Sequence, residues 1–406
     1  METAVLIIFI ATYAGIALGG IPGLALDRTG VALLGAIAMI VIGELTPEQA
    51  IGSIDVSTIL LLYGLMVISS QLRLGGFYTW VSAKIVRFVN IPDRFLLVMM
   101  SVSALLSACL ANDIICLAFT PVLTFSLLEA GLNPVPFLIG LAVSSNIGSA
   151  ATIIGNPQNM LIGQLGGLKF AHFFFWCAPP SVLSLAAAYI IIRISYRGNF
   201  YLFMPVSVGE QQWPAFDRHQ STKGIWAVAV LVVLFFTEIP RELTAITIAG
   251  LLLCSRKIET RSILGSVDWH LITLFCALFI VIKGVELIQL PSVFIKLLNS
   301  NGIDIHNLFT LTIVSAIFSN LFSNVQATML LTKFLSPADH LQWYVLALSS
   351  TFAGNLITIG SIANLITIEG AKEFGVVISF KEHAKTGIPV TVVSLLITLI
   401  WIGIFR

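Results

Sequence analysis

The sequence has few charged residues and almost no net charge. Asp, Glu, Lys and Arg make up 10% of its 406 residues and 57% are hydrophobic, whereas soluble domains contain about 25% charged residues. With 21 Lys and Arg against 20 Asp and Glu, the chain has no basic surplus with which to bind nucleic acid. The composition excludes an ordinary soluble protein and predicts one that crosses the lipid bilayer several times.

Cysteine is scarce and follows no metal-binding pattern. The chain has no CxxC motif and no histidine at ligand spacing from its five cysteines, Cys109, Cys116, Cys177, Cys254 and Cys276. This argues against disulfides, structural zinc and iron–sulfur clusters, and indicates small buried hydrophobic residues. Walker A, HExxH, nucleophile-elbow and dinucleotide motifs are also missing. We therefore expect neither an enzyme nor an ATP-driven pump, and no cofactor beyond a coupling ion, Na⁺ or H⁺.

Long apolar runs predict ten membrane crossings. A helix needs about 20 residues to cross the hydrocarbon, and suitable runs lie at 3–22, 29–46, 56–73, 135–166, 173–193, 224–239, 242–255, 268–287, 342–368 and 387–405. Two further apolar regions, 94–128 and 306–335, are too long for one crossing and carry a polar cluster at the middle. We expect each to be a re-entrant hairpin whose polar cluster points away from lipid.

The distribution of basic residues predicts the orientation. With this layout 15 of the 21 Lys and Arg residues fall on one side, which the positive-inside rule places in the cytoplasm. Both termini then lie on the non-cytoplasmic side of the cell's inner (plasma) membrane. Residues 194–223 become a cytoplasmic linker, and residues 77–89 are typical of a helix lying on the cytoplasmic surface.

Small and polar residues recur in the two halves of the chain. Gly52 and Asp55 match Gly265 and Asp268 at an offset of 213 residues. The order of matches continues with Ser103/Ser315, Ser107/Ser319, Asn112/Asn324, Gly155/Gly360, Asn159/Asn364, Pro179/Pro389 and Ser184/Ser394. They predict a duplication, with the first repeat at 1–193 and the second at 224–406. Five crossings per repeat invert the second copy, so we expect an all-α polytopic membrane protein with two inverted repeats, each containing a re-entrant hairpin and a broken helix.

Polar residues at membrane depth mark a candidate binding site. The runs 135–166 and 342–368 contain clusters of Ser, Thr, Asn and Gly, and Pro157 removes a backbone donor, so we expect both helices to break. Exposed half-helix N-termini bind anions, and Ser, Thr and Asn oxygens bind Na⁺ or hydroxyls. The candidate substrate- or ion-binding residues are Asn112, Asp113, Ser144, Ser145, Asn146, Gly148, Thr152, Asn156, Asn159, Ser323, Asn324, Gln326, Asn355, Thr358, Ser361 and Asn364. The candidates for holding Na⁺ are Asn112, Asn146, Asn324 and Asn355.

Asp113 is the sharpest single candidate. It is the only acid in the first hairpin, and its repeat counterpart is the neutral Val325. A buried ionisable group in a membrane is a functional candidate by default, so we expect Asp113 to hold the coupling ion or proton. The alternative is a structural acid bonded to freed backbone amides. The polar clusters likewise have an alternative role in close helix packing.

Several segments resemble a known transporter family. NDIICLAFTP, SSNIGSAATIIGNPQNMLIG, SNLFSNV and GSIANLI, followed by ISFKEHAKTGIP, resemble the arsenite/antimonite permease and citrate/dicarboxylate (anion) transporter group of the ion transporter superfamily. The resemblance implies a scaffold domain, a mobile domain with both hairpins and both broken helices, elevator-type movement and a homodimer. For an arsenite exporter it implies an ATPase subunit as a partner. The hairpin tips read Ala-Asn-Asp and Ser-Asn-Val, where the dicarboxylate branch has Ser-Asn-Thr motifs.

These features predict a secondary transporter of a small inorganic anion or metalloid such as arsenite, coupled to H⁺ or Na⁺. The polar clusters contain no Lys or Arg. Helix dipoles, amides and a bound cation must therefore balance an anion, or the substrate is neutral, as As(OH)₃ or Si(OH)₄ would be. The alternatives are a Na⁺- or H⁺-coupled dicarboxylate or citrate transporter, a Na⁺/H⁺ antiporter and a passive channel.

Overall fold

The structure is a computed structural model that describes residues 2–405 except 22, 202–214, 256, 291–299, 301 and 303. Across these residues the chain is helical, and its only β-type pairing is a single bridge between Leu132 and Tyr201. Much of the predicted linker 194–223 lies outside the described residues. The all-α class is confirmed.

Six of the described helices are long and apolar enough to cross a membrane. They are α4 (Val56–Leu74), α6 (Pro92–Cys109), α7 (Asn112–Glu129), α10 (Phe170–Ser195), α14 (Trp269–Leu287) and α20 (Phe380–Phe405). Shorter apolar helices are α1 (Glu2–Ala17), α2 (Arg28–Val41), α8 (Pro134–Ser149) and α16 (Leu308–Phe322). Together they make the chain an integral multi-pass membrane protein.

The remaining helices are shorter or more polar. In the first half they are α3 (Pro47–Gly52), α5 (Phe77–Val86) and α9 (Pro157–Leu165). In the second half they are α11 (Arg218–Phe235), α12 (Arg241–Leu253), α13 (Thr260–Leu264), α17 (Asn324–Leu331), α18 (His340–Ala353) and α19 (Ile362–Lys372), with short 3₁₀ turns η1 (Thr332–Phe334) and η2 (Thr358–Gly360).

Equivalent helices follow one another in the same order in both halves. Helices α1 to α4 correspond to α11 to α14, and α6 to α10 correspond to α16 to α20. The contacts between halves are reciprocal, because α4 packs against α12 while α14 packs against α2, and α7 packs against α19 while α17 packs against α9. Such reciprocity is what a two-fold relation between repeats produces. The predicted duplication is confirmed.

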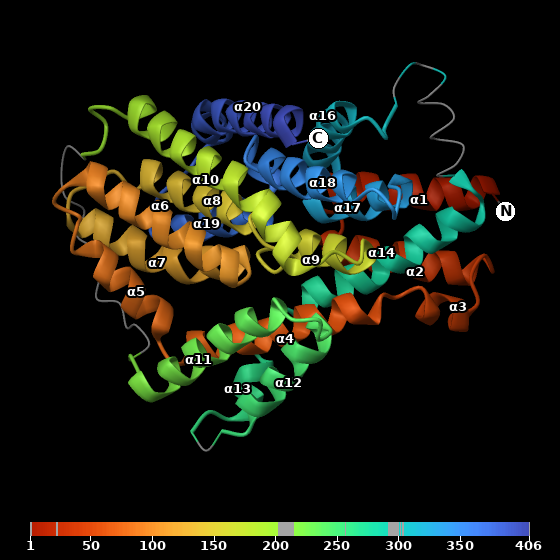
Figure 1. Cartoon of the computed structure of the whole chain (residues 1–406), viewed down its shortest axis with the longest axis horizontal. Coiled ribbons are helices and arrows are strands. Elements are labelled where there is room, and N and C mark those ends of the chain that lie inside the picture. Colours follow the sequence, from red (N-terminus) through yellow and green to blue (C-terminus); the bar gives the residue numbers. More distant parts are fainter. Residues whose placement is uncertain are drawn as a thin grey trace.

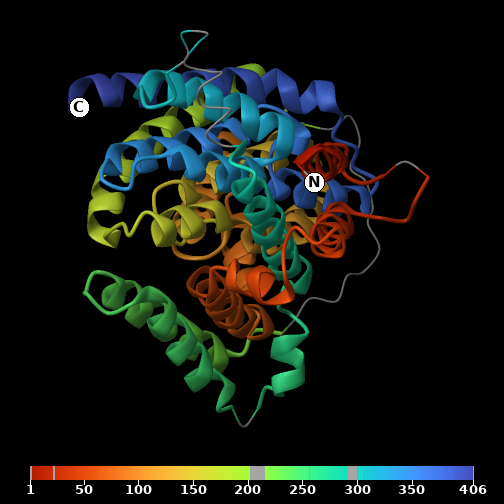
Figure 2. The same ribbon diagram turned by 90° about the vertical axis from the view of Figure 1, so that its right-hand side faces the viewer.

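The helices form two groups in space. In Figures 1 and 2 the green helices α11 to α13 lie along one edge with α4 beside them, and the blue helix α20 lies along the opposite edge. We call α1 to α4 with α11 to α14 the first group, and α6 to α10 with α16 to α20 the second group. Helix α9 of the second group packs against α4 of the first, and α17 packs against α14.

Both hairpins and both helix breaks are present. Leu110 and Ala111 separate α6 from α7, and Ser323, at φ +74°, separates α16 from α17. Residues 150–156 separate α8 from α9, and residues 354–361 separate α18 from α19. Pro157 occupies the first position of α9, where its missing N–H removes no helical hydrogen bond.

The prediction that all cysteines are buried was wrong. Cys116 and Cys177 are buried, but Cys109 and Cys276 are half-buried and Cys254 is exposed. Cys254 follows the last residue of α12. Its apolar sequence context therefore reflects the end of a membrane helix rather than a packed core.

Candidate functional site

Four helices begin at one small cavity at the centre of the second group. Helices α7, α9, α17 and α19 begin at Asn112, Pro157, Asn324 and Ile362. The cavity has a volume of about 10 Å³, which is room for about one water-sized group. Its lining is Asn112, Asp113, Pro157, Gln158, Ser323, Asn324, Val325, Ser361 and Ile362. The two hairpin tips and the two helix breaks therefore converge on this cavity.

The four helix ends give this cavity a positive electrostatic potential. Asn156 caps α9 and Ser361 caps α19, but no side chain caps α7 or α17. First-turn N–H groups have no partner within the helix. At α7 the N–H groups of Asn112 and Ile114 donate to the Gly155 and Ala111 carbonyls at 3.0 and 3.1 Å, so among the described residues Asp113 and the first turn of α17 supply the available donors. Helix N-termini also carry partial positive charge. The cavity is thus suited to oxygen atoms that accept hydrogen bonds.

Asn146 of α8 is the hub of the surrounding hydrogen bonds. Its Oδ1 accepts from Asn112 Nδ2 at 3.0 Å and from Ser361 Oγ at 2.9 Å. Its Nδ2 donates to Oδ1 of Asn355 at 2.9 Å and of Asn364 at 3.1 Å. Because the Asn146 oxygen already accepts two hydrogen bonds, it has no lone pair left for Na⁺ in this conformation. Asn146 holds the site together through these four hydrogen bonds.

Asn159 and Asn364 perform the same task in the two repeats. Asn159 Nδ2 donates to two backbone carbonyls of the first break, those of Ser149 at 3.3 Å and Thr152 at 3.0 Å. Asn364 Nδ2 donates to the equivalent carbonyls of the second break, those of Gly354 at 2.8 Å and Ile357 at 3.1 Å. Each of these lies 205 residues after its counterpart in the first break. Carbonyls at a break lose their helical donors. The amide nitrogens of both residues are therefore structural.

This arrangement fixes which atom of Asn112 is free. Carbonyls only accept, so Asn364 must turn its nitrogen toward them and its oxygen toward Asn146. Asn146 must then donate to Asn364 and present its oxygen to Asn112. The Asn112 Oδ1 is left buried and without a partner among the described residues. It is a free acceptor on a residue that lines the cavity.

Asn324, at the tip of the second hairpin, has a similar arrangement. With its amide nitrogen facing the second break, it donates to the backbone carbonyls of Ser350 at 3.1 Å and Gly360 at 2.9 Å. Its oxygen is then the atom not used by these bonds. Of the four residues predicted to hold Na⁺, Asn112 and Asn324 keep an available oxygen, whereas the Asn355 oxygen accepts from Asn146.

Several other predicted site residues have structural contacts instead. Ser145 Oγ donates to the Asn112 backbone carbonyl at 3.0 Å, and Thr152 Oγ1 donates to that of Ala108 at 2.6 Å, so both secure the first hairpin. Ser144 bonds within its own helix to Leu141 at 3.2 Å. A Cβ on Gly148 would lie 2.2 Å from the Ala104 carbonyl oxygen. Gly148 therefore permits α8 to pack against α6.

Two further predicted residues, Thr358 and Gln326, lie outside both the cavity lining and the Asn146 hydrogen-bond network. Thr358 is half-buried in η2, and none of its hydrogen bonds in the described structure reaches the Asn146 network. Gln326 is buried, and its Oε1 has no partner among the residues described. Neither residue lines the small cavity.

Asp113 lies where the small cavity meets a larger one. The larger cavity, of about 80 Å³, lies between the two helix groups and is also lined by Arg73, Asp268 and Pro157. An open cavity of about 620 Å³ shares Asp268 with it and reaches the ends of α1 and α2. Within the described chain no hydrogen bond or ion pair holds the Asp113 carboxylate. The contacts thus offer nothing for the alternative role as a structural acid.

The sequence interpretation missed three residues of this region. Gln158 lines the small cavity and, like Asn156, donates to Thr351 Oγ1 at 3.3 Å. His383 is 1% exposed, and its Nε2 lies 3.0 Å from the Asn355 backbone oxygen. Asp268 lines the larger cavity. Gln158 lies within the GNPQN segment and Asp268 matches Asp55 in the repeat, so both could have been identified as site candidates from the sequence.

Comparisons with known proteins give consistent matches along the chain. Residues 4–353 match the family described as "Citrate transporter". A 46 kDa membrane protein of Mycobacterium leprae is 29% identical over 97% of this chain and 96% of its own length. A silicon efflux transporter of Oryza sativa subsp. japonica is 27% identical over 94% of each chain.

A solved structure shares the fold. The crystal structure of the YdaH transporter of Alcanivorax borkumensis, described as having an unusual topology, covers 99% of this chain and 97% of its own with a TM-score of 0.60. At 13% sequence identity this similarity extends to the fold alone.

Proposed function

Because the chain belongs to the citrate transporter family, we propose that it is a secondary transporter of a small inorganic anion or metalloid of the arsenite type, coupled to H⁺ or Na⁺. The observation that carries this proposal is the convergence of four helix N-termini and Asp113 on one small cavity. Alternating access would come from movement of the second helix group against the first, as in an elevator. Half-helix N-termini near the membrane centre are the usual substrate sites of such carriers.

The lining of the small cavity supports a small oxygen-bearing solute. It contains no Lys or Arg, so partial positive charge comes only from the helix ends. It supplies donors through the uncapped α7 and α17 and acceptors through Asn112 Oδ1 and Asp113. Hydroxyl and oxo groups on one small centre, as in As(OH)₃ or Si(OH)₄, match this mixture. A cavity of about 10 Å³ has to widen before it holds such a solute, and it has to widen further for the larger citrate.

Asp113 supplies a physical reason for coupling. The helix ends that favour a bound anion also favour the Asp113 carboxylate, and two negative charges in one small cavity repel. Binding of an anion then requires a proton or Na⁺ at Asp113. This requirement couples transport of the anion to transport of the proton or Na⁺. A neutral solute would instead donate a hydroxyl to the carboxylate, and its release would accompany the change of ion at Asp113.

A dicarboxylate or citrate substrate is the second candidate. The larger cavity, where Arg73 and Asp113 both line the wall, favours it because a guanidinium can bind a carboxylate. A Na⁺/H⁺ antiporter would use Asp113 alone. Assembly as a homodimer, and an ATPase partner in the case of arsenite efflux, stay predictions.

A thermal-shift screen followed by flux measurement tests these proposals. Arsenite, antimonite, silicic acid, sulfate, succinate and citrate would be added to the purified protein with and without Na⁺, since a ligand of the folded state raises its apparent stability. We expect stabilisation by arsenite, antimonite or silicic acid, and accumulation of the same solute in proteoliposomes with an imposed H⁺ or Na⁺ gradient. Stabilisation by succinate or citrate alone would establish the second candidate. Ion exchange without any solute would establish an antiporter.

A further inference from the structure

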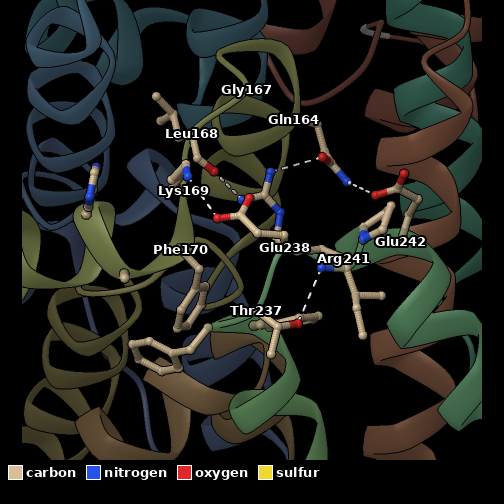
Figure 3. A pocket seen from close by; sticks show the side chains of 15 residues that line it. Gln164, Gly167, Leu168, Lys169, Phe170, Thr237, Glu238, Arg241 and Glu242 are labelled. Carbon is tan, nitrogen blue, oxygen red and sulfur yellow. Dashed lines mark hydrogen bonds and ion pairs between the residues drawn. The ribbon is translucent and has the colours of Figure 1, made fainter.

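Arg241 holds the end of α9 against the first helix group. It is the first residue of α12, and its guanidinium donates to the carbonyls of Gly163, at 2.8 Å, and Leu168, and to Gln164 Oε1 at 3.1 Å. Carbonyls at a helix C-terminus have no partner in the helix and carry partial negative charge, so a cation suits them. Figure 3 shows Arg241 and Gln164 in this contact.

Two more polar contacts join the region at the end of α9 to the region at the start of α12. Lys169 Nζ forms an ion pair with Glu238 at 2.8 Å, and Gln164 Nε2 donates to Glu242 at 3.0 Å. They surround a cavity of about 490 Å³ between the end of α9 and the start of α12. Figure 3 shows Lys169 of the loop after α9 beside Glu238 of the loop before α12, and Gln164 of α9 beside Glu242 of α12.

Arg28 is the counterpart of Arg241 in the first repeat. It is the first residue of α2, as Arg241 is of α12, and the offset of 213 residues equals that of Asp55 and Asp268. Arg28 is half-buried beside the open cavity, which Ile359 at the second helix break also lines. In the part of the chain that is described, it takes part in no ion pair or side-chain hydrogen bond.

The repeat relation identifies what Arg28 would hold. The offset of 205 residues that relates Asn159 to Asn364 places Ile368 and Glu369 where Gly163 and Gln164 lie in the first repeat. Both are in the last two turns of α19, which ends at Lys372. Glu369 is now paired with Lys372 on an exposed surface at 2.7 Å. A carboxylate is a stronger partner for a guanidinium than the Gln164 amide.

We propose that Arg28 and Arg241 are alternating latches that each stabilise one of the two transport conformations. In the conformation described here Arg241 is bound to the end of α9 and the cavity beside Arg28 is open. In the opposite conformation Arg28 binds the end of α19 at Glu369, and Arg241 releases α9. This inference rests on the proposed alternating access, because both latches act on the boundary between the moving helix groups.

A second pair of equivalent residues shows the same asymmetry. Glu286 of α14 forms an ion pair with Lys333 of η1 at 2.7 Å, which joins the two groups at the end of the second hairpin. The counterpart of Glu286 at the offset of 213 residues is Arg73. Arg73 forms no ion pair with the described residues. In the predicted topology Glu286 and Arg241 lie on the non-cytoplasmic side. On the predicted non-cytoplasmic side, Arg241 and Glu286 therefore form bonds across the boundary between the groups. On the predicted cytoplasmic side, their counterparts Arg28 and Arg73 form no described ion pair.

Paired cysteine cross-links measure the two conformations. In a background without the native cysteines, K169C with E238C replaces an ion pair of the present conformation. The repeat offsets of 210 and 213 place Ser379 and Ala25 at the equivalent positions for the opposite conformation. We therefore expect A25C with S379C to cross-link when Arg28 is engaged. The measurement is the ratio of the two cross-links in membranes, counted only for protein that elutes as folded in gel filtration.

The two arginine substitutions should move this ratio in opposite directions. Arg241→Gln should shift it about tenfold toward the second cross-link, and Arg28→Gln about tenfold toward the first, the size expected for losing hydrogen bonds from a charged group. Arg218→Gln, which removes an exposed arginine from α11, is the matched control and should leave the ratio unchanged.

The outcomes separate the latch from the transport function. An unchanged ratio in both variants, or a shift of both in the same direction, overturns the latch if the wild type shows gradient-driven flux. If the wild type shows no such flux and never forms the second cross-link, the proposed transport function itself fails. Among the described residues Arg28 takes part in no ion pair or side-chain hydrogen bond, so Arg28→Gln stays informative even if Arg241→Gln lowers the folded yield.

Discussion

Asn146 of the first repeat donates from Nδ2 to Oδ1 of Asn355 in the second repeat at 2.9 Å, so a buried hydrogen bond between side-chain amides joins the two halves of the chain. The Asn146 side chain forms three further hydrogen bonds, to the first hairpin tip and to the second break. A side chain that forms four buried hydrogen bonds is sensitive to substitution, because each buried partner that loses its hydrogen bond raises the free energy of the folded state.

Asn146→Ala should lower the free energy of unfolding by about 3 kcal/mol or more, because several buried polar groups lose their partner at once. Thermal or denaturant unfolding of the purified protein in detergent measures this. Ser181→Ala is the control, since its hydroxyl is buried but bonds only to Cys177 of its own helix at 2.8 Å. Equal losses in the two variants would contradict the role of Asn146 as a hub.

Substitution of the two residues that hold the helix breaks, Asn159 and Asn364, should lower the free energy of unfolding by different amounts. Asn159→Ala removes two hydrogen bonds to carbonyls, and Asn364→Ala removes two equivalent bonds and also the acceptor for Asn146. At about 1 kcal/mol for each bond, Asn364→Ala should be the more destabilising by about that amount. Unfolding of both variants under one set of conditions decides this. A larger loss for Asn159→Ala would show that the repeat equivalence does not extend to energetics.

Asp113→Asn keeps the size of the side chain and removes its charge. If Asp113 holds the proton or cation, the variant should lose gradient-driven accumulation in proteoliposomes while exchange of bound substrate continues. Asp93→Asn is the control, because Asp93 lies in the first turn of α6, just before the same hairpin, and forms an exposed ion pair with Arg193 at 2.9 Å. Wild-type gradient dependence in Asp113→Asn, normalised to inserted protein, would exclude the coupling role.

The predicted orientation can be tested by labelling with an impermeant thiol reagent. Ser221, in the predicted linker, is unsuitable because it is buried and its hydroxyl donates to the Gly75 carbonyl at 2.8 Å. His219 is exposed and lies on the same predicted side. His219→Cys should react only after the cells are permeabilised, and Glu238→Cys, on the opposite predicted side, should react in intact cells. The reverse pattern would invert the topology.

Much of the architecture follows from the sequence alone. A chain with 10% charge and repeated apolar runs has to bury those runs in lipid, and inside lipid only helices satisfy the backbone. Matches such as Asn112 with Asn324 identify the duplication without coordinates. Pro157 and the polar residues around it predict the break, because a lipid-facing helix would leave those groups unsatisfied. These inferences depend on local chemistry and spacing.

Only the tertiary structure decided what each polar residue does. Asn112, Asn146 and Asn159 look alike in the sequence, but one presents a free oxygen at the cavity, one joins the two repeats, and one holds a helix break. The sequence requires each buried amide to find a partner, but it does not say which, and the partners of Asn146 in the second repeat lie more than 200 residues away. Likewise, Arg28 and Arg241 occupy equivalent positions, yet Arg241 binds the end of α9 while Arg28 has no ion pair or side-chain hydrogen bond among the described residues. That difference depends on how the helix groups are placed in one conformation, which local sequence does not specify.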